Sequence, residues 1–133
     1  MHRAQFAKSY QAVAVSTATP GQLVLMLFDG ALRFISTAQH GFGAEPISTR
    51  NEQINNNLIK AQRILRELQC SLDMELGGEF STRMFALYDF MIEQLTQANL
   101  TKMETPIKVV EKLLSEVRDS WSQMLEQSQT KAA

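Results

Sequence analysis

Hydrophobic residues recur at steps of three and four over most of the chain, which is the spacing of one face of an α-helix. The pattern predicts four long helices, over about residues 20–40, 48–72, 79–98 and 105–126. No alternating strand pattern competes with them. Four long helices joined by short connections predict an all-α fold, an antiparallel four-helix bundle with a flexible N-terminal arm.

Side chains with capping chemistry mark the helix ends. Thr19 is the predicted N-cap of the first helix, because a proline follows it and Gln22 stands at capping-box spacing. Ser48 and Thr105 are the predicted N-caps of the second and fourth helices. Asn99 is the predicted C-cap of the third helix, because asparagine tolerates the left-handed conformation.

Polar positions on the helices also lead to expectations about contacts. We expect Asp29 to point to solvent or to pair with Arg33, and Asp89 to pair locally or with a basic group on a facing helix. The second helix carries a polar face that we expect to be solvated, formed by Asn55, Gln62, Arg63, Arg66 and Gln69.

The first and third helices are more apolar than the core of a four-helix bundle requires. One interpretation is that both helices lie at the centre of the bundle and pack on several neighbours. The other is that part of this apolar surface lines a groove for another chain, as in helix-in-groove recognition. Methionines on these helices support the second interpretation weakly, because flexible thioethers adapt to several shapes but also fill cores.

The two ends of the chain are rich in small and polar residues. We therefore expect residues 1–18 to form a flexible N-terminal arm, residues 19–126 the bundle and residues 127–133 a flexible tail. Phe6 and Tyr10 stand at helical spacing within the arm. Two interpretations stay open for the arm: a mobile terminus, or a segment that docks on an apolar surface of the same domain.

Composition narrows the class of protein. The 133 residues suffice for one domain with a core, and 13 basic against 14 acidic residues argue against a nucleic-acid-binding module. Asp29 and Arg33 interrupt the most apolar run, so no stable membrane insertion is expected. The N-terminal residues lack the apolar core of a secretory signal, and the single cysteine, Cys70, allows no intrachain disulfide. We therefore expect a cytoplasmic protein.

Residue clusters with catalytic or metal-binding spacing are missing from the sequence. His2 and His40 do not form a spaced pair, and no Glu-x-x-His or Cys/His cluster has metal-ligand spacing. The glycines do not form a phosphate-binding loop. We therefore expect no enzyme activity, no metal and no cofactor.

Two long motifs point to a family. TATPGQLVLMLFDGAL, residues 17–32, combines a small residue, Pro, Leu, Met-Leu, an aromatic residue and Asp-Gly-Ala. SLDMELGGEFSTRMFALYDFMIEQLTQANL, residues 71–100, combines Leu-Asp, Gly-Gly-Glu, Leu-Tyr, Met and Ala-Asn. In this order and at this separation the motifs resemble those of the FliS family, the flagellar export chaperones for flagellin. The resemblance extends from Tyr10 to Trp121.

The chain departs from the family pattern at two positions. Phe28 stands where the family often has tyrosine, so a hydroxyl contact is lost there. Arg83 stands where the family usually has asparagine, and the role of that asparagine cannot be transferred to it. The apolar character of the next position survives as Met84.

The resemblance implies a chaperone that binds the disordered C-terminal segment of flagellin, prevents premature polymerisation and assists delivery to the flagellar type III export gate. A disordered client loses conformational entropy on binding, so it needs a long apolar track to compensate. In the docking interpretation of the arm, Phe6 and Tyr10 cap this groove in the free protein and yield to the client. The expected partner-binding residues, each of which could equally belong to the core, are Leu23, Leu27, Leu32, Leu87, Tyr88, Met91 and Leu95.

Two other classes of function stay open. One is a homo-oligomeric structural or adaptor protein whose surplus apolar surface forms a homodimer. The other is a bundle enzyme that binds a small ligand or a metal, and the missing ligand motifs weigh against it.

Overall fold

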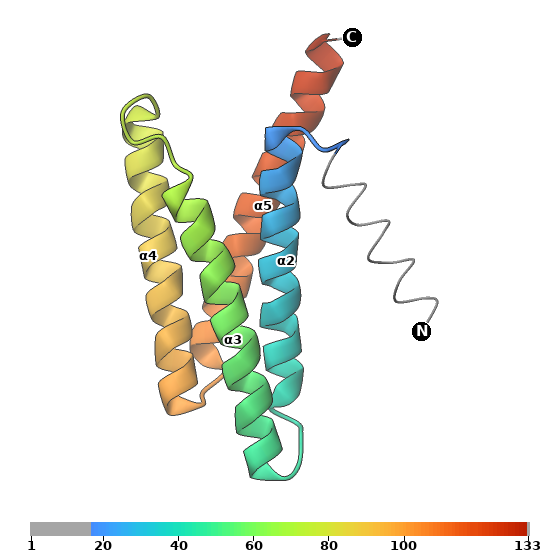
Figure 1. The fold of residues 1–133 in the computed structure, drawn as a ribbon, viewed down its shortest axis with the longest axis vertical. Coiled ribbons are helices and arrows are strands. Elements are labelled where there is room, and N and C mark those ends of the chain that lie inside the picture. Colours follow the sequence, from blue (N-terminus) through green and yellow to red (C-terminus); the bar gives the residue numbers. More distant parts are fainter. Residues whose placement is uncertain (1–16, 133) are drawn as a thin grey trace.

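A computed structural model describes residues 17–132 of the chain, with side chains described for residues 17–129. The described residues form helices α2 (Pro20–Gly41), α3 (Ile47–Cys70), α4 (Gly78–Thr101) and α5 (Thr105–Ala132), and they contain no strand. Consecutive helices run in opposite directions (Figure 1). The predicted all-α, antiparallel four-helix bundle is confirmed.

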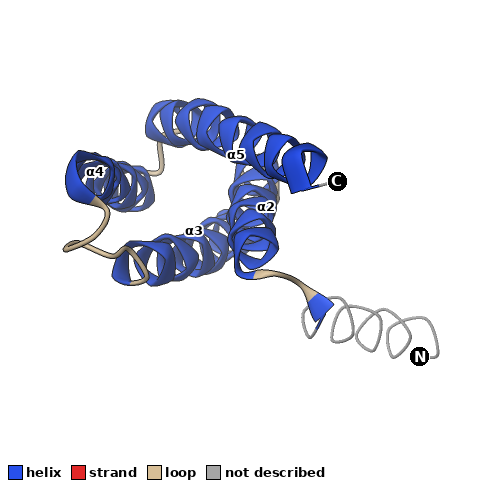
Figure 2. Cartoon of the chain, turned by 90° about the horizontal axis from the view of Figure 1, so that it is seen from above, coloured by secondary structure: helices blue, strands red, loops and turns tan. Residues whose placement is uncertain are grey.

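The helices are arranged so that α2 and α4 occupy diagonal corners, because each of them packs against both α3 and α5. α4 and α5 lie close together where residues 102–104 connect them, and they diverge toward the other end of the bundle (Figure 1, Figure 2). We call that other end the open end; α2 and α4 begin there, and α3 and α5 end there.

The core follows the predicted apolar seams of all four helices. On α4, Tyr88 rather than Leu87 faces the core, so the buried seam of this helix is rotated slightly from the predicted stripe. The buried hydrophobic residues are Phe28, Ala31, Ile35, Ala38, Ile54, Leu58, Ala61, Leu65, Leu68, Tyr88, Met91, Leu95, Ala98, Ile107, Val110 and Leu114.

The start of α2 agrees with the predicted capping chemistry, whereas the start of α3 does not. The Gln22 N–H donates to Thr19 Oγ1 at 3.2 Å, and the Thr19 N–H donates to Gln22 Oε1 at 3.0 Å, which confirms the capping box. Ser48 is not the N-cap of α3. The helix begins at Ile47, directly after Pro46, whose restricted φ and extended backbone already direct the chain into the first turn.

The predicted C-cap of α4 at Asn99 is also wrong. The helix continues to Thr101, and Lys102 takes the left-handed conformation with a φ of 53°. Asn99 instead donates from Nδ2 to Asn55 Oδ1 at 2.8 Å on a neighbouring helix, and its Oδ1 accepts a hydrogen bond from Lys102 Nζ. Thr105 is the first residue of α5 rather than its cap.

The polar face of α3 is not solvated as expected, because much of it packs on α4 through hydrogen bonds. Gln69 is buried, and Gln62 and Asn55 are half-buried. Gln62 Nε2 donates to the Ile92 carbonyl at 3.0 Å and to Thr96 Oγ1 at 2.8 Å. Polar groups on α4 therefore match the polar face of α3, and the spacing of α3 alone does not reveal this.

Ion pairs at Asp29 and Asp89 join neighbouring helices in the described part of the chain. Arg118 Nε on α5 lies 2.8 Å from Asp29 Oδ1 on α2, so the prediction that Asp29 pairs with Arg33 is wrong. The packing of α5 against α2 brings the Arg118 guanidinium within hydrogen-bonding distance of this carboxylate. Arg66 on α3 lies 3.3 Å from Asp89 on α4, which confirms the expected pairing with a facing basic group.

None of the helices formed by residues 17–132 is long and apolar enough to cross a membrane. Helix α5 continues to Ala132, past residue 126 at which the predicted bundle ends. Residues 1–16 and 133 lie outside the described part of the chain. The division into arm, bundle and tail therefore stays a prediction.

Candidate functional site

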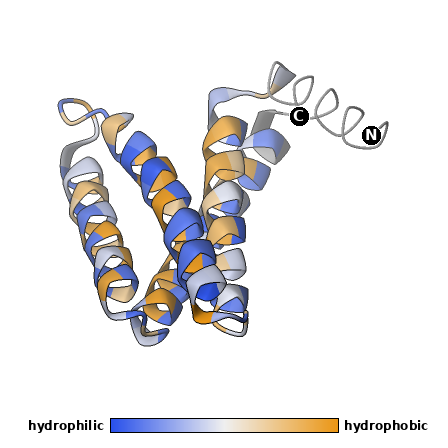
Figure 3. Cartoon of the chain, turned by 60° about the horizontal axis from the view of Figure 1, so that its bottom comes forward, coloured by the Kyte–Doolittle hydropathy of each residue, from blue (hydrophilic) through white to orange (hydrophobic). Residues whose placement is uncertain are grey.

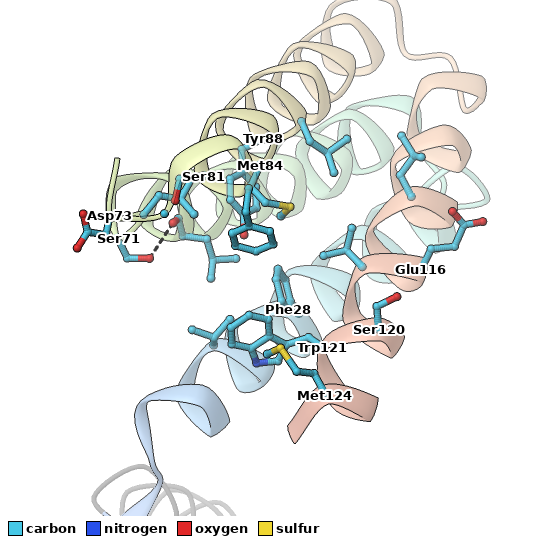
Figure 4. Close-up of a pocket in the computed structure, with 18 residues that line it drawn as sticks. Phe28, Ser71, Asp73, Ser81, Met84, Tyr88, Glu116, Ser120, Trp121 and Met124 are labelled. Carbon is cyan, nitrogen blue, oxygen red and sulfur yellow. Dashed lines mark hydrogen bonds between the residues drawn. The ribbon is translucent and has the colours of Figure 1, made fainter. Parts of the chain in front are cut away.

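An apolar pocket of about 670 Å³ lies at the open end of the bundle, where α4 diverges from α5 (Figure 4). Residues from all four helices line it, and most of these residues are apolar. Its volume falls within the range of about 300–1,000 Å³ that is typical of ligand sites in proteins. The bundle therefore holds a sizeable apolar concavity beside its core.

One wall of the pocket is the first half of α4. Phe80, Met84, Leu87 and Tyr88 line this wall at helical spacing. Tyr88 is 3% exposed and Phe80 is 58% exposed, so the wall passes from the core to solvent along the helix. Met84 and Tyr88 face the wall that α2 and α5 form on the other side (Figure 4).

The opposite wall combines the first half of α2 with the last part of α5. The rings of Phe28 and Trp121 meet edge to face, with centroids 6.4 Å apart. Trp121 Nε1 donates to the Gly21 carbonyl at 2.8 Å, which connects α5 to the first turn of α2. Val24 on α2 and Met124 on α5 also line the pocket. The wall is therefore held by a hydrogen bond as well as by packing.

The α3–α4 connection forms part of the pocket rim and explains the paired glycines of the second motif. Asp73 Oδ1 accepts the N–H groups of Glu75 and Leu76 at 3.1 and 2.9 Å. A Cβ at Gly77 would lie 1.7 Å from Ser81 Oγ and 2.6 Å from the Asp73 carbonyl oxygen, so only glycine fits without a shift of the backbone. The next residue, also glycine, has a φ of +54°.

Two carboxylates lie at opposite edges of the pocket, Asp73 beside α3 and Glu116 on α5 (Figure 4). No lysine or arginine is among the residues that line it. Burial raises the pKa of Tyr88 to about 12, so its phenol is neutral at physiological pH. This arrangement suits an apolar segment that carries a positive charge beside its apolar side chains.

The described residues contain no group of three or more His, Cys, Asp or Glu side chains that could hold a metal ion. The polar side-chain groups among the described residues that line the pocket are carboxylates, hydroxyls, one phenol and the indole N–H of Trp121.

The structure brings two of the predicted partner-binding residues to the pocket, Leu87 and Tyr88. The other two predicted on α4, Met91 and Leu95, are both 0% exposed and lie in the core below the pocket. The three predicted on α2, Leu23, Leu27 and Leu32, are half-buried and do not line it. Phe6 and Tyr10 lie outside the described residues. The assignment of these residues to a partner surface stays a prediction.

The sequence interpretation missed the contribution of α5 to the site. Val117, Trp121 and Met124 line the pocket, although their spacing is that of an ordinary core seam. The sequence feature that could have indicated this contribution is the large aromatic side chain of Trp121 near the end of the seam. Val24 and Phe28 of the first family motif were also missed, as were Phe80 and Met84 on α4, Leu68 near the end of α3 and Leu72 just after it.

The additional apolar side chains are half-buried on α2 but exposed on α4. On α2, Leu25 and Met26 are half-buried. On α4, Phe85 and Phe90 remain exposed, at 39% and 44%, in addition to the pocket wall. Figure 3 shows hydrophobic and hydrophilic residues interspersed along all the helices.

Comparison with known proteins gives the family. The sequence profile described as Flagellar protein FliS matches residues 2–128 of this chain. A Bacillus subtilis protein named Flagellar secretion chaperone FliS is 39% identical over 118 residues, which cover 89% of this chain and 84% of that protein. The Salmonella typhimurium protein of the same name is 37% identical over 129 residues, which cover 93% of each chain. The Escherichia coli protein of the same name is 35% identical over 114 residues, with 84% of this chain and 80% of that protein covered. The two motifs and the four-helix bundle agree with these matches, and the chain belongs to the FliS family.

Proposed function

We propose that this protein is a flagellar secretion chaperone and that its pocket at the open end binds the disordered C-terminal segment of flagellin. The observation that carries the proposal is the apolar pocket of about 670 Å³ between α4 and the α2–α5 wall. The names of the relatives support the same function. In this proposal, binding occurs in the cytoplasm, prevents premature polymerisation and assists delivery of flagellin to the flagellar type III export gate.

The cost of ordering the client explains why the pocket must be apolar. A disordered segment loses conformational entropy when it folds on a partner, and it compensates by burying apolar surface. An amphipathic helix does this by placing side chains of one face into a groove. Met84 and Leu87 are half-buried in the pocket, and the exposed Phe80 continues their apolar surface toward solvent. These three side chains offer consecutive contacts along about two turns of α4.

Calorimetric titration of the full chain with a peptide of the flagellin C-terminal segment tests the proposal. Leu87→Glu places a carboxylate in the α4 wall, and we expect it to weaken binding by about 100-fold, because the charge would be buried without a partner. Met124→Glu introduces the same charge from the opposite wall, at a residue that is 47% exposed and therefore tolerant of substitution. Phe90→Glu is the matched control, because Phe90 lies on α4 outside the pocket lining.

We expect Phe90→Glu to bind like the unsubstituted protein. Circular dichroism confirms that each variant remains helical. The proposal is wrong if the unsubstituted protein does not bind the peptide. It is also wrong if folded Leu87→Glu and Met124→Glu both retain full affinity.

The N-terminal arm is part of the same proposal: residues 1–16 cover the pocket in the free protein and yield to the client. The arm joins the bundle at the open end, where Thr17 precedes α2 (Figure 1). It carries Phe6 and Tyr10, three basic or histidine residues and no acidic residue, whereas the pocket edges carry two carboxylates. Deletion of residues 1–16 should raise peptide affinity. Unchanged affinity together with unchanged exposure of Trp121 to a fluorescence quencher would exclude this role.

A homo-oligomeric structural or adaptor function is the alternative, and exposed apolar residues on α4 favour it. Phe85 and Phe90 would lie in such a homodimer interface. Sedimentation velocity at increasing protein concentration, without peptide, separates the two functions. A monomer that binds the peptide agrees with the chaperone, whereas a dimer that excludes the peptide agrees with the alternative.

A further inference from the structure

A polar cluster of one buried glutamine and an exposed ion pair lies between α3 and α4 near the pocket. Gln69 on α3 is 3% exposed. Its Nε2 donates to the Phe85 carbonyl at 3.0 Å and to Asp89 Oδ1 at 2.8 Å, and its Oε1 accepts a hydrogen bond from Arg66 Nη1 at 2.5 Å. Arg66 Nη1 also lies 3.3 Å from Asp89 Oδ1. We call Arg66, Gln69 and Asp89 the α3–α4 clasp.

The clasp holds the same two turns of α4 that form the pocket wall. Met84 and Tyr88 line the pocket. The residues that directly follow them, Phe85 and Asp89, accept the hydrogen bonds of Gln69 Nε2. Neighbouring residues on a helix point about 100° apart, so one face of this segment meets the clasp and the next face meets the pocket. A rotation or a shift of α4 along its axis would therefore change the clasp contacts and the pocket wall together.

Support for this part of α4 comes chiefly from α3. α4 packs on α3 and α5, but α5 diverges from it toward the open end (Figure 1). Apolar packing between two helices is not directional, whereas hydrogen bonds require defined donor and acceptor positions. A buried amide with two donor contacts to α4 and one acceptor contact within α3 therefore defines the rotation and register of the two helices.

We propose that Gln69 is a positioning residue: through the α3–α4 clasp it fixes the first half of α4 and keeps the pocket in its open form before any client binds. The effect on client affinity rests on the proposed function, whereas the position of α4 does not. Without the clasp, the first half of α4 shifts toward the apolar α2–α5 wall, because closing the pocket buries apolar surface.

The chain provides a matched control for this proposal. Gln62 lies two turns before Gln69 on α3 and makes the same kind of contact, to the Ile92 carbonyl and Thr96 Oγ1. Neither of these partners lines the pocket. Leucine retains approximately the volume of glutamine and removes its hydrogen bonds. The Gln69→Leu and Gln62→Leu variants therefore separate a positioning role from the general loss of an interhelical hydrogen bond.

Electron paramagnetic resonance distance measurements on the full chain test the positioning directly. Spin labels at Thr82→Cys on α4 and Gln123→Cys on α5, in a Cys70→Ser background, report the width of the open end; both positions are exposed and outside the pocket lining. We expect Gln69→Leu to shift the distance distribution to shorter values and to lower peptide affinity about tenfold. We expect Gln62→Leu to leave both quantities unchanged.

The proposal is overturned if Gln69→Leu keeps the original distance distribution, or if Gln62→Leu changes it equally. A shifted distance with unchanged peptide affinity refutes the link to client binding. If the unsubstituted protein does not bind the peptide, the proposed function fails, and the distances still decide the positioning role. Should Gln69→Leu not fold, Asp89→Ala removes the clasp from the α4 side and is judged by the same two readouts.

Discussion

Burial of Tyr88 couples the ionisation of its phenol to unfolding of the bundle. The side chain is 3% exposed, and burial raises its pKa from 10.0 to about 12. In the unfolded chain the phenol loses its proton near its ordinary pKa, whereas the native protein retains the proton up to about pH 12. Tyr88 therefore contributes stability that is fully present below pH 10 and is lost as the pH rises through the native pKa.

The size of this contribution follows from the pKa difference. Two pKa units correspond to about 2.7 kcal/mol in total, and about 1.4 kcal/mol of it is lost by pH 11. Urea unfolding, followed by circular dichroism near neutral pH and at about pH 11, measures the loss. Tyr88→Phe is the control, because it keeps the ring and lacks the ionisable group. We expect the unsubstituted protein to lose about 1.4 kcal/mol more than Tyr88→Phe between the two conditions.

Titration of lysine and arginine side chains affects both proteins equally, so it cancels in this comparison. Ultraviolet absorbance of a Tyr10→Phe variant, which leaves Tyr88 as the single tyrosine, reports the ionisation itself. Equal losses of stability in the two proteins, or half-ionisation of Tyr88 near pH 10 in the folded state, would refute the reasoning.

Three further predictions concern the ends of the bundle, and each is checked by urea unfolding. Gly77→Ala should cost about 2 kcal/mol, because the new Cβ would meet the Asp73 carbonyl oxygen; an unchanged midpoint would contradict this. Trp121→Phe keeps the aromatic contact but loses the hydrogen bond to the backbone of α2, and it should cost about 1 kcal/mol. Asn99→Ala leaves the half-buried Asn55 without its partner, which should cost about 1–2 kcal/mol; an equal cost for Asn55→Ala alone and for the double variant would support the pairing.

The bundle could be predicted because the sequence features that specify it, apolar periodicity and helix caps, are local. Steps of three and four place Ile35 and Leu65 on the apolar stripes of their helices, and the structure buries both completely. Thr19 caps its helix as predicted because the capping box closes within one turn. Asn99 does not cap its helix, because its partner Asn55 comes from another helix and no local pattern indicates it.

The site could be predicted only in part because it depends on the angle between helices. Leu87 and Tyr88 belong to an apolar stretch and were expected at a partner surface, and both line the pocket. Trp121 and Met124 have the spacing of a core seam, and they line the pocket because α4 diverges from α5 beside them. Gln69 has the spacing of a solvated position, and only the packing of α4 on α3 buries it.

The proposed function requires that the C-terminal segment of flagellin occupies the pocket at the open end. Nuclear magnetic resonance of the full chain, labelled at its methionine methyl groups and titrated with the flagellin peptide, tests it most directly. Met84 and Met124 lie on opposite walls of the pocket, whereas Met103 is 57% exposed in the connection at the other end of the bundle. We expect the Met84 and Met124 signals to shift and saturate together while the Met103 signal stays unchanged. Shifts confined to Met103, or no shift at any methionine under saturating peptide, would contradict it.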